Sequence, residues 1–504
     1  MRKTSLLVGA GLALPAVLLA KPQAKPNIIF ILCDDMGYGD LACYGQPFIS
    51  TPNIDRMASE GMRFTQAYAG SPVSAPSRAC IMTGQHSGHG HVRGNKEHWK
   101  NSATVYYGEN PDFAVVGQEP YDPNHIIVPE IMKDQGYRTG LFGKWAGGYE
   151  GSVSTPDKRG IDEFYGYICQ FQAHLYFPNF LNRYSKQLGD TAVVREVLDE
   201  NIQHAMSGKD YRLRTQYSAD LIHQHALSWI DQQDGQQPFC GFFTYTLPHA
   251  ELWQPDDSLV ERYQKKFFVD KTWGGQPDSR YNATEHTHAQ FAAMITRLDQ
   301  YVGDIFAKLK ERGLDRNTIV VFTSDNGPHE EGGADPAFFG RDGKLKGLKR
   351  ECYEGGIRIP FIAWWPEHIA AGSTSDQPFA FYDLLPTFCD LAGVKNYQRQ
   401  YGKKNDATYF DGLSIAPTLL GQPDKQLQHD YLYWEFTETD QIAVRQGDWK
   451  LIVIKGVPHL YNLATDIHED TDLKNAHPEL VARLIDIIKQ EHTDNPDYPV
   501  TLPY

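Results

Sequence analysis

The stretch NIIFILC, residues Asn27–Cys33, is an unbroken apolar run that is followed at once by the acidic pair Asp34-Asp35. An uninterrupted run of this kind is typical of a strand that is buried on both faces near the centre of a parallel sheet. A second apolar run, Thr318–Thr323, precedes the pair Asp325-Asn326. The two runs predict neighbouring elements of one sheet, each with oxygen-bearing side chains at its carboxyl end.

Around these runs, strand-like and helical segments alternate along most of the chain, which indicates an α/β fold. We expect a large, mixed but mainly parallel β-sheet sandwiched by helices. The other segments predicted here are helices over 127–135, 218–232 and 288–312 and strands over 137–143, 238–247 and 360–365.

The pattern changes after about residue 424, where short strands are separated by turn residues and followed by a helical segment. This favours a smaller C-terminal α+β domain, with an antiparallel sheet and a terminal helix. The predicted organisation is a signal peptide over 1–24, a catalytic domain over 25–424 and a C-terminal subdomain over 425–504. The short strands are expected at 431–436, 442–446 and 449–455, and the helix at 479–491.

The first residues have the three parts of an export signal. Arg2 and Lys3 are positive, Leu6–Leu19 is a short apolar run, and the small residues Ala20 and Ala24 offer cleavage sites. We therefore expect a periplasmic or secreted protein, the alternative being a buried N-terminal helix. No internal apolar stretch is long enough for a membrane span, so we expect no stable membrane anchor.

Composition excludes some functions. The net charge of −15 over 504 residues argues against a nucleic-acid partner, because phosphate binding needs a basic face. The seven cysteines are scattered without paired spacing, which is neither a disulfide framework nor a zinc-binding pattern.

The two polar pairs suggest a metal site. Ligands of an open parallel sheet bind at the carboxyl ends of its strands, where Asp34, Asp35, Asp325 and Asn326 are expected to meet. Such oxygen ligands suit a hard cation, calcium or magnesium. The alternative is that each pair caps a turn or helix, and for either pair alone this is the commoner arrangement.

The segment Ser71–Gln85 is expected to turn from loop into helix near Ser74, since Pro76 suits a first helical turn. A helix start attracts anions through its free N–H groups, and Arg78 adds a positive charge. A plain N-cap is the alternative. The histidines that follow, at positions 86, 89 and 91, do not have metal-site spacing, and we assign them a structural role.

These motifs occur in an order that resembles the sulfatase family, in its formylglycine-dependent, alkaline-phosphatase-like form, over residues 26–461. The Ser-x-Pro-Ser-Arg and Thr-Gly signature is the most specific part of the resemblance. The matching motifs are Asp34-Asp35, Ser74-x-Pro-Ser-Arg78, Thr83-Gly84, Gly143-Lys144-Trp145, Pro248-His249, Ser324-Asp-Asn-Gly327 and Lys349-x-x-x-x-Glu354-Gly-Gly-x-Arg358.

The resemblance implies that a maturation enzyme oxidises Ser74 to formylglycine (3-oxoalanine), whose hydrate attacks sulfur. It also implies one calcium ion, with magnesium the lesser candidate, bound by residue 74 and by Asp34, Asp35, Asp325 and Asn326. In the family, such an ion activates the nucleophile and holds a sulfate oxygen.

The same resemblance gives roles to four further residues. Arg78 matches the arginine that steadies the formylglycine, and Lys144 and Lys349 match the lysines that neutralise sulfate oxygens. His249 matches a histidine that protonates the leaving alcohol. A solvated lysine and a loop histidine are the ordinary alternatives.

One position departs from the family pattern. Many sulfatases have histidine after Lys-Trp, where this chain has Ala146. That histidine is thought to help release the sulfate. His174 is a candidate substitute or substrate contact, the alternative being a packed histidine beside aromatic residues.

The segments 170–178 and 326–340 resemble a bacterial branch of polysaccharide sulfatases, which implies a sulfated mono-, oligo- or polysaccharide substrate containing galactose or N-acetylgalactosamine, including 4-sulfated units. We expect Arg93, His174, His329 and Asp335 to line the sugar site, because ring hydroxyls are bound by planar polar groups.

Two other functions stay open. A phosphodiesterase or phosphonate hydrolase of the same superfamily uses similar metal pairs, although it commonly needs two ions and more histidines. A non-catalytic glycan-binding relative would keep the fold and an unmodified Ser74, but the retained Lys144, His249 and Lys349 argue against such decay.

Overall fold

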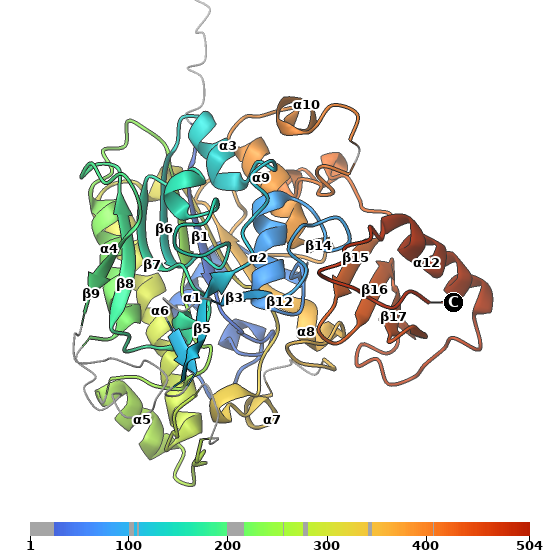
Figure 1. The fold of residues 1–504 in the computed structure, drawn as a ribbon, viewed down its shortest axis with the longest axis horizontal. Coiled ribbons are helices and arrows are strands. Elements are labelled where there is room, and N and C mark those ends of the chain that lie inside the picture. The colour runs from blue at the N-terminus through green and yellow to red at the C-terminus, as the bar shows by residue number, and fades with distance from the viewer. Residues whose placement is uncertain are drawn as a thin grey trace, which may run out of the picture.

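The structure, a computed structural model, describes residues 25–99, 105–107, 110–198, 216–255, 257–275, 281–340, 345–406 and 408–503. The predicted signal peptide, residues 1–24, lies outside these residues. Figure 1 shows a large sheet covered by helices and, to one side, a smaller sheet built from the C-terminal part of the chain.

Eleven of the described strands form the large sheet, in the order β13-β2-β12-β11-β1-β10-β6-β7-β8-β9, with β14 paired to β2. The central strands β11, β1, β10, β6 and β7 are parallel, and β12 runs antiparallel to β11. The predicted fold class, a mixed and mainly parallel sheet between helices, is thereby confirmed. The strands are β1 (Asn27–Cys33), β2 (Met62–Tyr68), β6 (Arg138–Lys144), β7 (Glu163–Tyr167), β8 (Phe180–Ser185), β9 (Val194–Val197), β10 (Phe239–Thr244), β11 (Thr318–Ser324), β12 (Arg358–Trp364), β13 (Ser373–Ser375) and β14 (Phe379–Ala380).

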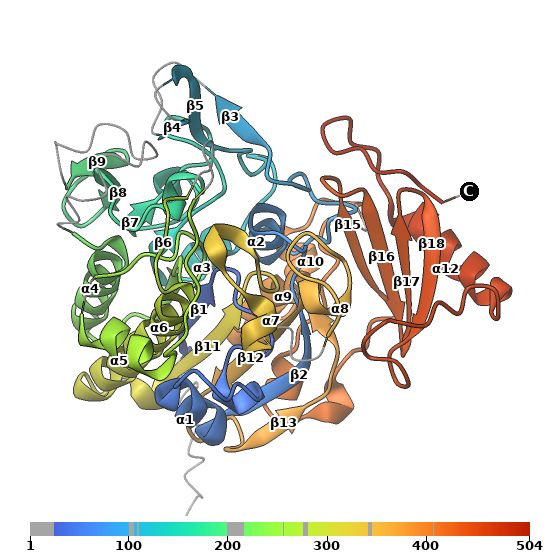
Figure 2. The same ribbon diagram turned by 90° about the horizontal axis from the view of Figure 1, so that it is seen from below.

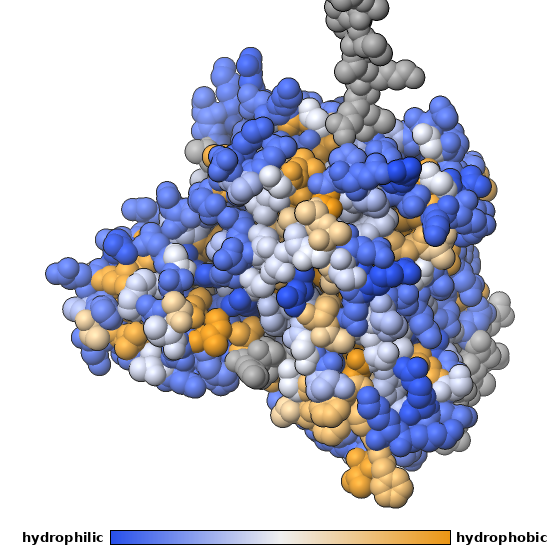
Figure 3. Space-filling model, turned by 180° about the vertical axis from the view of Figure 1, so that it is seen from behind, coloured by the Kyte–Doolittle hydropathy of each residue, from blue (hydrophilic) through white to orange (hydrophobic). Residues whose placement is uncertain are grey.

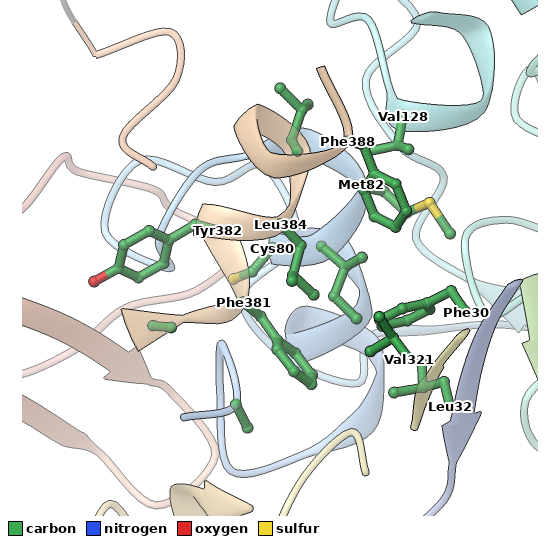
Figure 4. Packing of buried hydrophobic residues seen from close by; sticks show 14 of the residues in the cluster. Phe30, Leu32, Cys80, Met82, Val128, Val321, Phe381, Tyr382, Leu384 and Phe388 are labelled. Carbon is green, nitrogen blue, oxygen red and sulfur yellow. The ribbon is translucent and has the colours of Figure 1, made fainter. Parts of the chain in front are cut away.

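Strand β1 shows why the sheet needs helices on both faces, because its side chains alternate between two separate hydrophobic clusters. Ile28, Phe30 and Leu32 join one cluster, and the intervening residues of the strand join the other. Each buried aliphatic or aromatic side chain contributes about 1.5–3 kcal/mol relative to exposure, so neither face tolerates solvent. Figure 4 shows Phe30 and Leu32 beside Val321, and Met82 beside Phe388.

Each face of the sheet has its own set of helices. One face is covered by α1 (Pro52–Glu60), α4 (Ser218–Asp231), α5 (Ser258–Lys266) and α6 (Thr287–Glu311). The other is covered by α2 (Ser74–Thr83), α3 (Val128–Asp134) and α9 (Leu384–Leu391). Shorter helices lie in the connections, namely α7 (Pro336–Phe339), α8 (Glu354–Ile357), α10 (Tyr397–Tyr401) and α11 (Ala416–Leu419).

The smaller sheet is antiparallel, as the sequence predicts, and has the order β15-β16-β17-β18. One of its faces packs on α12 and the other on the main core, where the Trp434 indole N–H donates to Ala69 O at 2.8 Å. Figure 2 shows its strands side by side. The domain boundary at residue 424 stays a prediction. The elements are β15 (Leu432–Phe436), β16 (Gln441–Gln446), β17 (Trp449–Ile454), β18 (Val457–Asn462) and α12 (Pro478–Glu491).

A third sheet is formed by β3 (Glu97–Trp99), β5 (Asn110–Gln118) and β4 (Val105–Tyr107). Within the described ranges, no helix combines the length and apolar character that crossing a membrane requires. The face drawn in Figure 3 is covered mainly by hydrophilic residues, with apolar residues scattered among them.

Candidate active site

The site begins where β1 and β11 end. The two strands are parallel neighbours in register, with Cys33 opposite Ser324, so both polar pairs leave the sheet at the same edge. Their polar groups then contact one another directly. The Asp35 N–H donates to Asp325 Oδ1 at 3.1 Å, and Asn326 Nδ2 donates to Asp35 Oδ1 at 2.7 Å. The pairs therefore share one site and do not cap separate turns.

Helix α2 brings Ser74 to these residues. Ser74 is the first residue of the helix and Val73 holds the N-cap position, so the serine is not a plain N-cap. Its hydroxyl instead donates to Asp34 Oδ1 at 2.9 Å and lies 3.4 Å from Asn326 Oδ1. The start of the helix thus presents the Ser74 oxygen to the polar edge of the sheet.

The four side chains at this edge fit a hard cation. Asp34, Asp35, Asp325 and Asn326 are at most 1% exposed and offer three carboxylates and one amide oxygen. Burial and the nearby Asp34 raise the pKa of Asp325 to about 6. Such a shift means that the interactions of Asp325 with its protein neighbours do not offset the cost of burying its charge. A divalent cation bound to its oxygens would stabilise the charged form.

Three cations surround the carboxylates. Arg78 Nε donates to Asp325 Oδ2 at 2.9 Å, and Lys144 Nζ lies 2.5 Å from Asp34 Oδ2. Burial alone would raise the pKa of Asp34, but Lys144 and other cations hold it well below its usual range. On the opposite side, Lys349 Nζ donates to Asp35 Oδ2 at 2.9 Å.

Glycine is required immediately before Lys144. Gly143 has a φ of +128°, and a Cβ there would lie only 2.0 Å from the carbonyl oxygen of Thr244 on the adjacent strand. No other residue tolerates both the backbone conformation and this close approach. The Gly143-Lys144 pair therefore places the ammonium group at the end of β6, beside Asp34.

Three histidine rings stack next to Lys349. The ring of His249 lies between those of His174, at a centroid distance of 4.4 Å, and His329, at 5.5 Å. His249 Nδ1 contacts Ala250 O, and its Nε2 lies 3.1 Å from Lys349 Nζ. Burial and Lys349 lower the pKa of His249, so Nδ1 carries the proton and Nε2 accepts from the lysine.

A cavity of about 170 Å³ opens above Ser74, and its wall contains four of the expected site residues besides this serine. Other wall residues were not predicted from the sequence. Gln170 and Glu331 lie inside segments that already resembled known sulfatases, whereas Asn95 and Glu438 had no recognisable signal. The wall consists of Ser74, Asn95, Glu97, Lys144, Gln170, His174, His249, Glu331, Lys349, Arg350 and Glu438.

Three residues expected to line the sugar site lie elsewhere. Arg93 is buried and donates to Gly90 O and Thr493 O, while its guanidinium faces Glu435 at 3.3 Å.

Asp335 caps α7 by accepting from Phe338 N, and it also pairs with His288. His329 lies behind His249, where its Nδ1 accepts from the Glu331 N–H. Each of these side chains serves a local hydrogen-bond network and is absent from the cavity wall.

The loop that carries Lys349 is held by the C-terminal sheet. Lys450 on β17 is fully buried between Glu354 and Glu469, at 2.9 and 3.0 Å. Glu469 Oε2 also accepts from the Glu354 N–H, and its backbone oxygen accepts from Lys346. Removing one partner of such a buried network costs about 3–5 kcal/mol, because it leaves a buried charge uncompensated.

The histidines after α2 join this helix to the C-terminal helix. His89 Nδ1 lies 2.9 Å from Asp411 Oδ1, and His86 Nε2 lies 3.0 Å from Glu491 on α12. The Gly88 N–H donates to His86 Nδ1, which leaves the proton on Nε2. Nε2 then donates to Glu491 and ties the segment after α2 to α12, while the structural role assigned to these histidines stays a prediction.

We expect His89→Gln to cost about 1 kcal/mol more stability at pH 6 than at pH 9. Burial alone would lower the pKa of His89, but Asp411 and Glu491 raise it above the usual value. A raised histidine pKa contributes stability that is complete below the unfolded-state pKa and is lost as the pH rises through the folded-state pKa. Denaturant unfolding at both pH values measures the difference. The control is His91→Gln, because the side chain of His91 is half-exposed. An equal cost of His89→Gln at both pH values would contradict the pairing of a charged His89 with Asp411 and Glu491.

Comparisons with known proteins agree with this geometry. A family model described as Sulfatase matches residues 26–394, and one described as N-sulphoglucosamine sulphohydrolase, C-terminal, matches residues 347–493. The N-acetylgalactosamine-6-sulfatase of Rattus norvegicus is 32% identical over 429 residues, which is 83% of this chain and 70% of the relative.

Two further comparisons cover more of the chain. The N-acetylgalactosamine-6-O-sulfatase of Bacteroides thetaiotaomicron is 27% identical over 93% of both chains. Among solved structures, Ps i-CgsB in complex with k-i-k-neocarrahexaose has a TM-score of 0.70 and 26% identity, with 95% of each chain covered.

Proposed function

The chain belongs to the sulfatase family, and we propose that it is an exported, calcium-dependent enzyme that removes sulfate from a sulfated sugar through an oxidised Ser74. As a family member it is a sulfuric ester hydrolase. The observation that carries the proposed mechanism is the Ser74 hydroxyl, 2.9 Å from Asp34, in a cavity walled by Lys144, His249 and Lys349.

Asp34, Asp35, Asp325 and Asn326 would hold the calcium ion, with residue 74 beside them. When bound, calcium would polarise a sulfate oxygen and favour the deprotonated nucleophile. The formal charges of the four nearest carboxylates and the four nearest cationic side chains balance. A bound calcium ion would therefore make the site net positive, and so able to attract a sulfate ester. The carboxylates are Asp34, Asp35, Asp325 and Glu331, and the cations are Arg78, Lys144, Lys349 and Arg350.

Oxidation of Ser74 by a maturation enzyme would give, after hydration, a nucleophilic hydroxyl that a plain serine lacks. Asp34 accepts the hydrogen bond from the Ser74 position and so fixes the direction of that oxygen. Arg78 fixes Asp325 and approaches Asp34 at 3.7 Å, which keeps both carboxylates in place. The chain therefore orients the nucleophile before the substrate arrives.

Lys144 and Lys349 line the cavity together with Ser74, where they would stabilise charge that develops on the sulfate oxygens. His249 accepts a hydrogen bond from Lys349 through Nε2. Transfer of one ammonium proton of Lys349 through this nitrogen to the leaving sugar oxygen would leave Lys349 neutral until water reprotonates it. A correctly placed acid of this kind contributes about 10²–10⁴-fold in rate.

His174 is our candidate for the histidine that the family pattern lacks at Ala146. Its ring is parallel to that of His249 within 7°, and its Nδ1 has no hydrogen-bond partner among the residues that the structure describes. Burial, followed by the neighbouring His249, lowers the pKa of His174 well below its usual value. The ring is therefore neutral and would hold a proton only transiently during release of the sulfate.

The proposed substrate is a sulfated galactose or N-acetylgalactosamine unit of a glycan. Support comes from the N-acetylgalactosamine-6-sulfatases among the relatives and from the bacterial polysaccharide sulfatases that residues 170–178 resemble. The N-acetylgalactosamine-6-sulfatases favour a sulfate at O6, and the resemblance to polysaccharide sulfatases favours one at O4. Sulfate release from the 4-sulfate and 6-sulfate of both sugars identifies the position.

We expect the Ser74 peptide from the native host to lack two hydrogens in a mass spectrum, because conversion of serine to formylglycine removes them. The mass of the N-terminal peptide of the same native protein also reports whether residues 1–24 have been cleaved. An unmodified serine in the native protein would support the non-catalytic glycan binder.

Faster hydrolysis of an aryl phosphate than of the paired aryl sulfate would support the phosphohydrolase.

A further inference from the structure

A hollow beside α10, at the top of Figure 1, is lined by positive charges, although the whole chain has a net charge of −15. The segment from Lys395 to Lys404 contains four cations and no carboxylate. Three of the four cations line this hollow, which we call the α10 hollow and which has a volume of about 810 Å³. Its wall consists of Asn396, Gln398, Arg399, Gly402, Lys403, Lys404, Asn405 and Asp406.

The cations of the α10 hollow are not neutralised by ion pairs. Arg399, Lys403 and Lys404 are exposed, and none of them forms a salt bridge or a side-chain hydrogen bond with a residue that the structure describes. Asp406, the one carboxylate of the wall, accepts from the N–H and the hydroxyl of Thr408. Three cations and one carboxylate give the wall a formal charge of +2. A concave surface of one charge sign concentrates ions of the opposite sign, here anions.

The α10 hollow is separate from the catalytic cavity. It adjoins a second hollow of about 290 Å³, because Lys403 and Asp406 line both, and this second hollow reaches Thr83 at the end of α2. Ser74 lies at the other end of this helix, whose ten residues span roughly 15 Å. Among the residues that the structure describes, none lines both the cavity above Ser74 and either of the two hollows. A ligand in the α10 hollow is therefore distinct from the sulfate ester held at Ser74.

The wall of the α10 hollow fits a sulfated sugar chain better than a membrane surface. The amides of Asn396, Gln398 and Asn405 lie among the cations, and planar polar groups of this kind bind ring hydroxyls. Proteins that bind in the plane of a membrane also bury apolar side chains in it. None of the large hydrophobic residues exposed in the described part of the chain lies between residues 391 and 410.

We propose that the α10 hollow is an accessory site that binds the chain of a sulfated glycan while the catalytic cavity acts on one of its sugars. The choice of a sulfated glycan rests on the proposed function, but binding at the accessory site needs no turnover. Arg399, Lys403 and Lys404 contact sulfate groups of the chain, and the amides bind the rings between them. A chain that is held at this site keeps further sulfate esters at a high local concentration near Ser74.

The test measures binding of two polymers that differ in sulfation, dextran sulfate and dextran, to the full chain. We expect dextran sulfate to bind and dextran not to bind, with an affinity that falls as salt screens the exposed charges. The triple variant Arg399→Gln, Lys403→Gln, Lys404→Gln should weaken the binding of dextran sulfate about tenfold, since each exposed ion pair contributes about two- to threefold. Glutamine is a good helix former, so these substitutions should leave α10 intact.

The matched control is the triple variant Lys310→Gln, Arg483→Gln, Lys489→Gln. It removes the same charge from exposed cations of α6 and α12 that form no salt bridge with a described residue, and it should change the affinity less than about twofold. An equal loss in both triple variants would show a general effect of net charge and overturn the accessory site. Equal binding of dextran and dextran sulfate would overturn it as well.

Two further measurements separate this inference from its alternatives. Vesicles of phosphatidylglycerol that bind more tightly than dextran sulfate, and lose binding in the α10 triple variant, would assign the hollow to a membrane and overturn the glycan site. With the native enzyme, kcat/KM for a sulfated monosaccharide should be the same in the α10 triple variant and the wild type. A loss for the monosaccharide equal to the loss of dextran sulfate binding would overturn the separation of the two sites.

The failure of this inference and the failure of the proposed function give different results. Absence of turnover of every sulfate ester, together with weaker dextran sulfate binding by the α10 triple variant alone, would overturn the sulfatase mechanism and keep the accessory site. Unchanged binding of dextran sulfate by this variant would overturn the accessory site even in an active sulfatase.

Discussion

Ser74→Ala is expected to lower kcat for sulfate release by on the order of 10⁶-fold, comparable to the loss of a nucleophile in a serine protease. The methyl group cannot be oxidised to an aldehyde, so no nucleophilic hydroxyl forms beside Asp34. Sugar binding should persist, because Lys144, His249 and Lys349 remain in the wall. Initial rates of sulfate release and calorimetric binding of the same sugar measure the two effects.

Ser71→Ala is the matched control for this variant. Ser71 is a buried serine three positions earlier, and its hydroxyl has no hydrogen-bond partner among the described residues. Its loss should leave turnover within about twofold of the wild type and cost less than about 1 kcal/mol of stability. If Ser74→Ala retained turnover within about tenfold of the wild type, position 74 could not supply the nucleophile.

The central strands of the fold were predictable because burial on both faces leaves an unbroken apolar run in the sequence. Strand β1 has the predicted bounds, and β11 extends one residue beyond its predicted end at Thr323. Strand β18 was not predicted. Its sequence VPHLYN contains a proline and has an exposed first residue, so it lacks the apolar run of a central strand.

The candidate site also contains residues that the sequence could identify and residues that it could not. Residues at strand ends and at the start of α2 could be proposed to meet, because parallel strands and the helices after them share one edge of a sheet. Their catalytic roles stay predictions. Asn95 and Glu438 could not be found, since they come together only through the packing of the C-terminal sheet against the segment after α2. Arg93 lies outside the cavity wall, and a lone arginine in the sequence gives no sign of a buried partner such as Glu435.

The C-terminal sheet is consequently part of the candidate site and not only a separate stable unit. It holds the loop of Lys349 through Lys450 and Glu469, and the turn between β15 and β16 supplies Glu438 to the cavity wall. This sheet both positions a cation and lines the cavity, so the shape of the cavity wall depends on how the two sheets pack.

Calcium is expected to stabilise the wild-type protein strongly, and Asp325→Asn should abolish this increment. An ion that binds only the folded state adds about 2.7 kcal/mol when its concentration is 100 times its Kd. Asp325 carries a negative charge whose cost of burial its protein neighbours do not offset, as its pKa of about 6 indicates. Asparagine keeps an acceptor for Arg78 but removes that charge. The measured quantity is the rise in Tm on adding calcium to chelator-treated protein.

Asp299→Asn provides the control, because Asp299 is a buried carboxyl group whose pKa burial also raises to about 6, but it accepts from the Asn53 and Ile54 N–H groups of α1. This variant should be less stable with and without calcium yet keep the full calcium increment. Magnesium should give a smaller increment, since it demands a stricter octahedral shell. An increment that survives in Asp325→Asn, or disappears equally in Asp299→Asn, would place the ion away from the ends of β1 and β11.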